Sequence, residues 1–333
     1  MSESSMPPMR SDWVGRRVVV RHSGESAEPP YHDIVGELVE ITATHAVVRR
    51  ADGEGRRLPL DRVVAAKVVT ASTRDILATE EVCARGWRAI DTRWSRGWLL
   101  RADHGFTRRA NSALPLRPIQ GSLDEVVAAA HDWYGARGLP VLVSCPLPAR
   151  QALDDALADR GFSAPVDVDV MVAALPAVPP PTEPVEIAPV PSADWLAGYH
   201  YRGAAEVPDY GRAILTRHDR VGFATVRRGG AVAGVARSAV AGVARGAVDG
   251  DWLGVTAVEV DPRVRRTGVA TSLLGALRDW AVREHGASRS YVQVETTNDA
   301  AIRLYAGLGY WHHHVYRYRI DPRANGQLTT ISA

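Results

Sequence analysis

Hydrophobic and polar residues alternate in short runs along the first seventy positions, which is the period of β-strands. Turns rich in glycine and polar residues separate these runs, so that five strands fit into about sixty residues. The expected strands are residues 17–21, 34–41, 46–50, 56–60 and 63–69. We therefore expect a small β-barrel over residues 1–72, because closing the sheet removes its exposed edges.

From residue 73 the apolar residues follow the period of a helix, with Ile76, Leu77 and Val82 on one face. Strands and helices then alternate as far as residue 174, which predicts a segment of mixed α and β structure over residues 73–175. The expected elements are a strand at 97–101, a helix at 123–136, a strand at 140–144, a helix at 149–160 and a strand at 166–174.

A proline-rich segment, residues 176–191, is expected to be a stiff linker in polyproline II conformation. After it the pattern predicts a further domain over residues 192–322, followed by a tail at 323–333. This domain should begin with helices at 192–199 and 210–218 and strands at 222–228 and 231–239.

The next segment has the pattern strand, basic turn, helix. A β-type run containing Val258 and Val260 stops at a proline, and a helix begins near Gly268. The first N–H groups of a helix lack partners, and the helix dipole and Arg265 and Arg266 favour an anion there. A diphosphate is the natural guest.

Two blocks of the sequence resemble the signature of the GNAT acetyltransferase superfamily. The first comprises Val260, Pro262, Arg265, Gly268 and Ala270, and the second Asn298, Ala301, Tyr305, Gly309 and Tyr310. The resemblance implies an α/β (α+β) fold with a mixed, mostly antiparallel sheet. It also makes residues 73–175 a degenerate GNAT-like half domain and residues 192–322 the catalytic GNAT domain.

The N-terminal segment is similar to SH3-like and Sm-like barrels in its strand pattern. As a whole the chain is similar to actinobacterial GNAT proteins with such a barrel, a group described as candidate N-acetylglutamate synthases. The resemblance implies an acetyl-CoA-dependent N-acetyltransferase that moves an acetyl group to a primary amine by direct attack in a ternary complex. Glutamate is one acceptor to consider. Alternatives are a protein lysine or N-terminus, docked by the barrel, and a CoA-binding sensor without catalysis.

By the same resemblance, acetyl-CoA would lie along the strand of Val258 and Val260 and over the helix start. Asn298 would hydrogen-bond its pantetheine arm. The expected cofactor-binding residues are Val258, Val260, Arg265, Arg266, Thr267, Gly268, Val269, Ala270, Thr271 and Asn298.

Tyr305 stands where the family has the tyrosine that protonates the departing thiolate, although its spacing also fits a core aromatic residue. Many relatives carry a glutamate where this chain has Gly254. The expected base is therefore Glu259, which could instead bind the acceptor ammonium or face outward, and Glu295 is the second candidate.

The basic loop at residues 105–111 has two interpretations. Thr107, Arg108, Arg109 and Asn111 could face an acidic acceptor from across the domain boundary, or the loop could be solvated with its charges paired locally.

Composition and charge restrict the remaining functions. A formal net charge of +2 and equal acidic and basic content in the first seventy residues argue against nucleic-acid binding. No apolar segment is long enough to span a membrane, and Cys83 and Cys145 form no metal or disulfide pattern, so a cytoplasmic protein is expected. The run His312–His314 is not expected to bind a metal, because in a strand His312 and His314 would share one face and His313 would point to the other. The sequence leaves open whether the protein forms a homo-oligomer.

Overall fold

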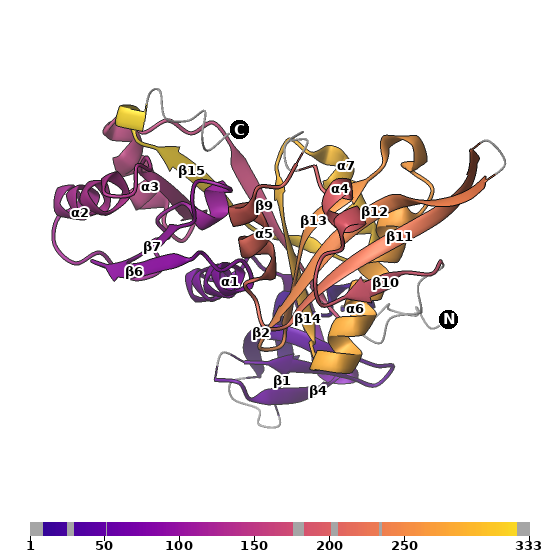
Figure 1. Ribbon diagram of the computed structural model, residues 1–333. Coiled ribbons are helices and arrows are strands. Elements are labelled where there is room, and N and C mark those ends of the chain that lie inside the picture. The colour runs from indigo at the N-terminus through magenta and orange to yellow at the C-terminus, as the bar shows by residue number, and fades with distance from the viewer. Residues whose placement is uncertain are drawn as a thin grey trace. The chain divides into compact units, whose positions relative to one another are not determined.

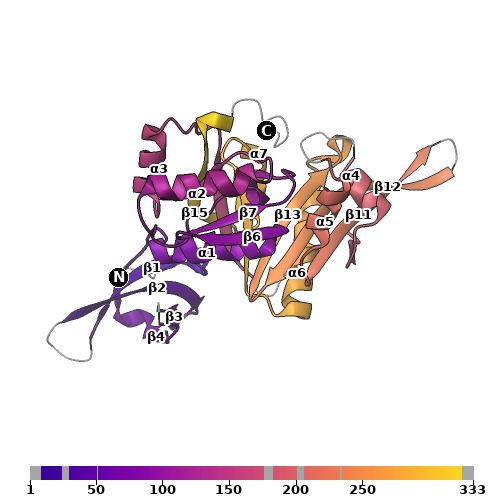
Figure 2. The same ribbon diagram turned by 60° about the vertical axis from the view of Figure 1, so that its left-hand side comes forward.

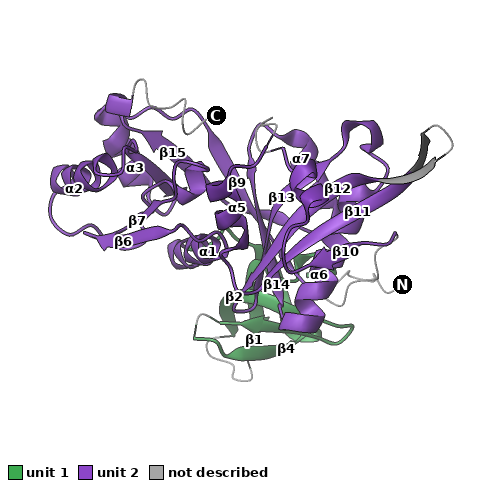
Figure 3. Cartoon of the chain, viewed as in Figure 1, with its two compact units in different colours: residues 1–72 green, residues 73–333 purple. Residues whose placement is uncertain are grey.

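The computed structural model describes residues 9–24, 30–50, 52–175, 183–200, 206–232 and 235–324. The chain forms two compact units, residues 1–72 and residues 73–333 (Figure 3). Among the helices of these described ranges, none combines the length and apolarity that a membrane crossing requires.

Unit 1 is a five-stranded antiparallel sheet in the order β4-β3-β2-β1-β5. Its alternating pattern turns Val18, Val20, Ile34, Leu38 and Val48 into one buried cluster, as the sequence predicts. No pair joining β4 to β5 is found among the described residues, so the sheet is barrel-like but its closure is not seen. The strands are β1 (Arg17–Ser23), β2 (Tyr31–Ile41), β3 (His45–Arg49), β4 (Gly55–Pro59) and β5 (Val63–Val68).

Unit 2 is built on an eight-stranded sheet in the order β10-β11-β12-β13-β14-β9-β15-β8 (Figure 1). Only β13 and β14 pair in parallel, so the expected mixed and mostly antiparallel sheet is confirmed. The strands are β8 (Leu142–Leu147), β9 (Asp167–Ala174), β10 (Glu186–Ala188), β11 (Val221–Val232), β12 (Val235–Asp249), β13 (Trp252–Val260), β14 (Arg289–Glu295) and β15 (Trp311–Ile320). A separate hairpin consists of β6 (Asp91–Ser95) and β7 (Trp98–Ala102).

Helices cover both faces of this sheet (Figures 1 and 2). On one face α6 packs on β11 to β13 through Leu273 and Leu277. On the other, Trp195 of α4 and Ile214 of α5 pack with Phe223 of β11, because successive strand residues point to opposite faces. The helices are α1 (Thr73–Gly86), α2 (Leu123–Gly135), α3 (Gln151–Asp159), α4 (Ala193–Gly198), α5 (Asp209–Thr216), α6 (Val269–His285) and α7 (Asp299–Gly307).

The sheet runs without a break through the two halves of unit 2. Strand β9 of the first half lies between β14 and β15 of the second, and β15 in turn pairs with β8. The division of unit 2 into a half domain and a catalytic domain stays a prediction, but the two halves share one sheet.

Two local expectations differ from the structure. The strand expected at 231–239 spans the end of the β11–β12 hairpin, because Gly229 and Gly230 continue β11 opposite Ser238 and Arg237 instead of turning. Within the expected linker, Glu186–Ala188 is the edge strand β10, which pairs with β11. This short run contains no proline, so its N–H groups can join the ladder. Residues 176–182 of the linker lie outside the described residues.

Asp154 joins α3 to the C-terminal strand. Its fully buried carboxylate accepts two hydrogen bonds of 2.7 Å from Arg319 and one of 3.1 Å from Arg317. Arg317 also pairs with Asp167 of β9 at 2.8 Å. A charge network therefore spans the strands that the two halves exchange.

Asp154→Asn should lower the free energy of unfolding by on the order of 3 kcal/mol, since it leaves buried arginine charge without its carboxylate. Urea unfolding followed by tryptophan fluorescence measures the change. Asp155→Asn is the matched control, because its exposed side chain accepts only from Gln151, and it should change stability by less than about 0.5 kcal/mol. Equal losses in the two variants would contradict this role for Asp154.

Candidate active site

Strands β13 and β14 pair side by side only at their beginnings. Their register runs from Trp252 opposite Arg289 to Val255 opposite Val292, and no further pair between them occurs in the described chain. On the other edge of β13 a bulge sets two residues, Ala257 and Val258, against one residue of β12. Ala257 has a φ of 53°, unusual for a residue with a Cβ. The bulge turns β13 away from β14 and leaves a gap in the ladder.

A cavity of about 360 Å³ lies at this gap. Its walls come from the parted ends of β13 and β14, from α7, from β15 and from the loop after β7. The residues that matter below are Trp87, Thr107, Arg108, Arg109, Val258, Glu259, Glu295, Asn298, Tyr305, Tyr316 and Tyr318. The structure therefore brings both expected catalytic residues, Glu259 and Tyr305, to one cavity.

The basic turn before α6 has the expected form. Gly268 is the residue before the helix, with a φ of 92°, which favours glycine. The first turn of α6 contains no acidic residue, and no side chain caps its N–H groups. Thr267 is held by two contacts: its hydroxyl donates to the carbonyl of Val264 at 2.7 Å and accepts from Arg228 at 2.6 Å. The helix start is thus rigid and open to an anion.

The other expected cofactor residues follow the same segment. The Nε of Arg265 donates to the carbonyl of Val260 at 3.3 Å. Val258 and Val260 pack against the core beneath α6, and Val258 also lines the cavity. Val269 is buried at the start of α6, whereas Arg266, Thr267 and Thr271 are exposed and Ala270 is half-buried.

Glu259 is a half-buried carboxylate at the edge of the cavity. Burial raises its pKa above the ordinary glutamate value, and the charges of His200 and Arg265 partly oppose that rise. It also lines a neighbouring groove of about 830 Å³ beside α4, together with His200 and Arg263. The interpretation of Glu259 as an outward-facing strand residue is therefore incomplete, because the residue lines both the cavity and the groove.

Tyr305 both packs in the core and reaches the cavity. Its ring stacks edge-on against Tyr310 with ring centres 5.8 Å apart, and burial raises the pKa of its hydroxyl. The phenol is therefore protonated at neutral pH. Asn298 starts α7 by accepting from the N–H of Ala301 at 3.1 Å, which turns its side chain to the same cavity wall.

Gly254, where many GNAT relatives have glutamate, is required by packing. A Cβ at this position would lie 2.3 Å from the hydroxyl oxygen and 2.4 Å from Cζ of Tyr291, which is paired with it across β13 and β14. Tyr291 is buried, and no side chain other than hydrogen fits beside it. Tyr291 therefore leaves no room for a carboxylate side chain at position 254.

The loop from Asp103 to Asn111 also reaches the cavity, although it comes from the first half of the unit. Thr107, Arg108 and Arg109 line the cavity wall. The interpretation of this loop as solvated with locally paired charges is wrong, because neither arginine forms an ion pair with any described residue. The sequence made these residues candidates for facing the acceptor, but it could not place them beside Tyr305, since the chain between them fixes no distance.

The histidine run at the start of β15 contacts two carboxylates. His312 contacts Asp169 at 2.7 Å, which raises the pKa of this imidazole, and His314 contacts buried Glu80 at 2.9 Å. A bulge at His313 places His312 and His314 opposite consecutive residues of β9, so the expectation that they share a face is wrong. No group of three metal-ligand side chains was found in the described residues.

Fold and site together define a GNAT-type N-acetyltransferase. A family model described as "Probable histone acetyltransferase Rv0428c C-terminal" matches residues 73–319, and "Rv0428c N-terminal Sm-like domain" matches residues 13–67. The chain belongs to this family, and the expected resemblance to GNAT acetyltransferases is confirmed.

Two relatives are similar along most of their length. "Probable histone acetyltransferase Rv0428c" of Mycobacterium tuberculosis (strain ATCC 25618 / H37Rv) is 31% identical over 319 residues, which cover 92% of this chain and 94% of that protein. "Uncharacterized N-acetyltransferase YobR" of Bacillus subtilis (strain 168) is 26% identical over 263 residues, 74% of this chain and 98% of that protein.

Among solved structures, a "GCN5-related N-acetyltransferase" from Kribbella flavida superposes with a TM-score of 0.54 at 16% identity. The match covers 74% of this chain and 95% of that one. At this identity the match shows the fold alone, which agrees with the GNAT architecture of unit 2.

Gly254→Ala should lower the free energy of unfolding by about 1–3 kcal/mol, since its Cβ overlaps the buried ring of Tyr291. Chemical denaturation measures the loss. Gly275→Ala is the control: it lies inside α6, nothing is within 4 Å of its added Cβ, and it should stabilise the protein by about 0.5–1 kcal/mol. A Gly254→Ala protein as stable as the parent would show that Tyr291 does not require the glycine.

Proposed function

We propose that this enzyme transfers an acetyl group from acetyl-CoA to a primary amine at the cavity between β13 and β14. The observation that carries the proposal is that a half-buried carboxylate and a buried phenol meet at one gap in the sheet, and that β13, which borders this gap, leads into an open helix start. Each answers one requirement of acyl transfer from a thioester to an amine.

The cofactor side fits the chain's own groups. The unpartnered N–H groups at the start of α6 and the charges of Arg265 and Arg266 would hold a diphosphate, and no acidic residue in that turn opposes it. The free edge of β13 beyond Val255 offers main-chain groups to an extended pantetheine arm, with Asn298 on the opposite wall. One such N–H could polarise the thioester carbonyl.

Burial suits Glu259 to act as the base and Tyr305 to act as the acid. Glu259, with its raised pKa, would accept the proton of the amine as its nitrogen attacks the carbonyl carbon. As the new C–N bond forms and the C–S bond breaks, Tyr305 would give its proton to the departing sulfur. Burial raises the pKa of this hydroxyl, so the phenol is protonated at neutral pH and has a proton to give.

The name of the M. tuberculosis relative suggests histone lysine as one acceptor. The groove beside α4 would then take the peptide, because Glu259 borders both hollows. A free amino acid such as glutamate is the other candidate, and a sensor that binds CoA without turnover is the third. Turnover of acetyl-CoA with free amines and with lysine peptides separates these three.

Gly268→Glu should weaken CoA binding at least about 100-fold, because it puts negative charge and bulk where the diphosphate is expected. Isothermal titration calorimetry measures the affinity. Gly268→Ala is the control for the backbone. It introduces the same strain at a positive φ but adds no charge, so it should weaken CoA binding much less. CoA binding to Gly268→Glu as tight as to the parent would mean that the cofactor lies elsewhere.

Tyr305→Phe should lower kcat by about 100-fold with little change in CoA affinity, as a lost general acid would. Steady-state kinetics and calorimetry give the two quantities. Tyr310→Phe is the matched control, because this buried neighbour hydrogen-bonds Ser290 and does not line the cavity. Full activity in Tyr305→Phe would show that Tyr305 only packs in the core and is not the general acid.

A further inference from the structure

The loop that carries Arg108 and Arg109 is held rigidly. The side-chain oxygen of Asn111 accepts from the N–H groups of Asp103 and Gly105 at 2.7 and 3.0 Å, and its amide donates to the carbonyls of Asp103 and Thr107. Thr107 accepts in turn from the indole of Trp87 at 3.0 Å. The arginines therefore project from a loop whose main chain is fixed before any ligand binds.

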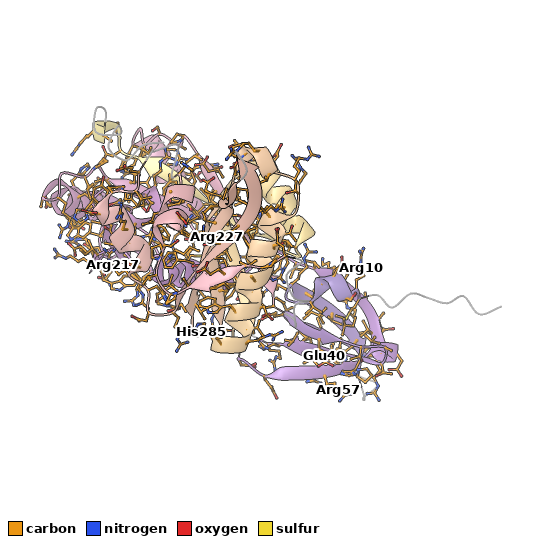
Figure 4. All side chains as sticks on the ribbon, turned by 45° about the vertical axis from the view of Figure 1, so that its right-hand side comes forward. Arg10, Glu40, Arg57, Arg217, Arg227 and His285 are labelled. Atoms are coloured by element: carbon orange, nitrogen blue, oxygen red, sulfur yellow. The ribbon has the colours of Figure 1, made fainter. Side chains whose placement is uncertain are left out.

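The base of this loop is anchored to the second half of the unit. Asp103 is fully buried and pairs with Arg217 at the end of α5, which Figure 4 labels. Arg217 also donates to the carbonyl of Arg88 at 3.0 Å. These buried contacts fix the position of the loop, which distinguishes it from a solvated surface loop.

Positive charge near the cavity lacks compensation. The Nε atoms of Arg108 and Arg109 are buried without a hydrogen-bond partner, and so is one terminal nitrogen of Arg245 just below. Arg245 is fully buried, donates only to uncharged oxygens and lies 5.0 Å from the ring of Trp87. None of the three forms an ion pair with a described residue.

Aromatic rings and hydroxyls complete this wall. The guanidinium of Arg108 lies 6.0 Å from the ring of Tyr318, and that of Arg109 lies 5.8 Å from the ring of Trp87. Arg109 has a side-chain hydrogen bond with Tyr316 but no carboxylate partner among the described residues. Burying a cation without an opposite charge is costly, and a bound anion would offset that cost. The same charges would repel a lysine-rich peptide from this wall.

The cavity also contains two carboxylates, Glu259 and Glu295. Glu259 lies on β13 and is the proposed base, while Glu295 at the end of β14 has interactions of its own. They lie on the cofactor strands, whereas Arg108 and Arg109 lie on the loop from the first half. An acceptor could therefore direct its amine toward Glu259 and an anionic group toward the arginines.

We propose that the acceptor is a small primary amine that carries an anionic group, bound by Arg108 and Arg109 and directed by them toward the thioester. This rests on the acetyl transfer proposed above. A volume of about 360 Å³ suits a small acceptor, because the acetyl end of the cofactor must share it. An α-amino acid supplies a carboxylate, and an amino-sugar phosphate supplies a phosphate. Bidentate guanidinium contacts suit both.

The first experiment compares kcat/KM of the full-length protein for glutamate, glycine, glucosamine 6-phosphate, ethanolamine and a lysine-rich peptide. At least one amine with an anionic group should exceed both the peptide and ethanolamine, which has no anionic group, by about tenfold or more in kcat/KM. Preference for the amino acids assigns a carboxylate, and preference for the sugar assigns a phosphate. Preference for the peptide or equal use of ethanolamine overturns the proposal.

The second experiment changes the arginines. Arg108→Gln and Arg109→Gln should each raise KM for the anionic amine by about tenfold to hundredfold without changing KM for acetyl-CoA. Arg109→Lys, which keeps charge but loses the fork, should recover part of the effect and guards against misfolding of the glutamine variant. Arg117→Gln removes an exposed arginine stacked on Trp94 at 3.9 Å and should change neither constant.

A binding measurement separates this proposal from the proposed function. N-acetylglutamate and N-acetylglucosamine 6-phosphate are titrated into the CoA-loaded protein and its Arg109→Gln variant by calorimetry. Arginine-dependent binding without acetyl transfer to any amine would retain the anion site and reject the transfer. Acetyl transfer that is insensitive to both arginine variants would retain the transfer and reject the anion site.

Discussion

The parting of β13 from β14 is the constraint on which the site depends. A parallel pair that continued past Val255 and Val292 would satisfy its own main-chain groups and leave no room for a ligand. The bulge at Ala257 prevents this, because two residues of β13 occupy the space of one opposite β12. The strand therefore exposes an unpaired edge beside the start of α6, and the cavity with Glu259 and Tyr305 follows from the same geometry.

The exchange of strands between the halves of unit 2 explains how remote residues reach this cavity. Because β9 lies between β14 and β15, the first half is built into the catalytic sheet. The buried network of Asp154, Arg317 and Arg319 crosses this junction. The first half thus supplies part of the wall of the cavity, although its sequence has no glycine-bearing turn like the one before α6.

Electrostatics divides the cavity into two sides. The β13 side carries a carboxylate whose burial raises its pKa and thereby strengthens it as a base. The loop of the first half contributes Arg108 and Arg109, which form no ion pair with a described residue. An acceptor with an amine and an anion would match both sides. On the proposal made above, the loop of the first half would select the acceptor, whereas the turn before α6 would hold the cofactor.

The sequence alone determined the local elements. Alternation over the first seventy residues predicted the five strands of unit 1, and the spacing from Val258 to Gly268 predicted the strand, turn and helix that hold the cofactor signature. Tyr305 and Asn298 were predicted because both belong to one short motif around α7. Periodicity and turn chemistry act between near neighbours, so such features can be recognised without knowing the fold.

Only the tertiary structure decided which distant residues meet. It joined the loop of Arg108 and Arg109 to the cavity, inserted β9 beside β14 and showed that Tyr291 excludes a side chain at position 254. It also continued β11 through Gly229 and Gly230, where local propensity favours a turn. These outcomes depend on strand pairing and side-chain packing between segments far apart in the chain, and local sequence carries no measure of those distances.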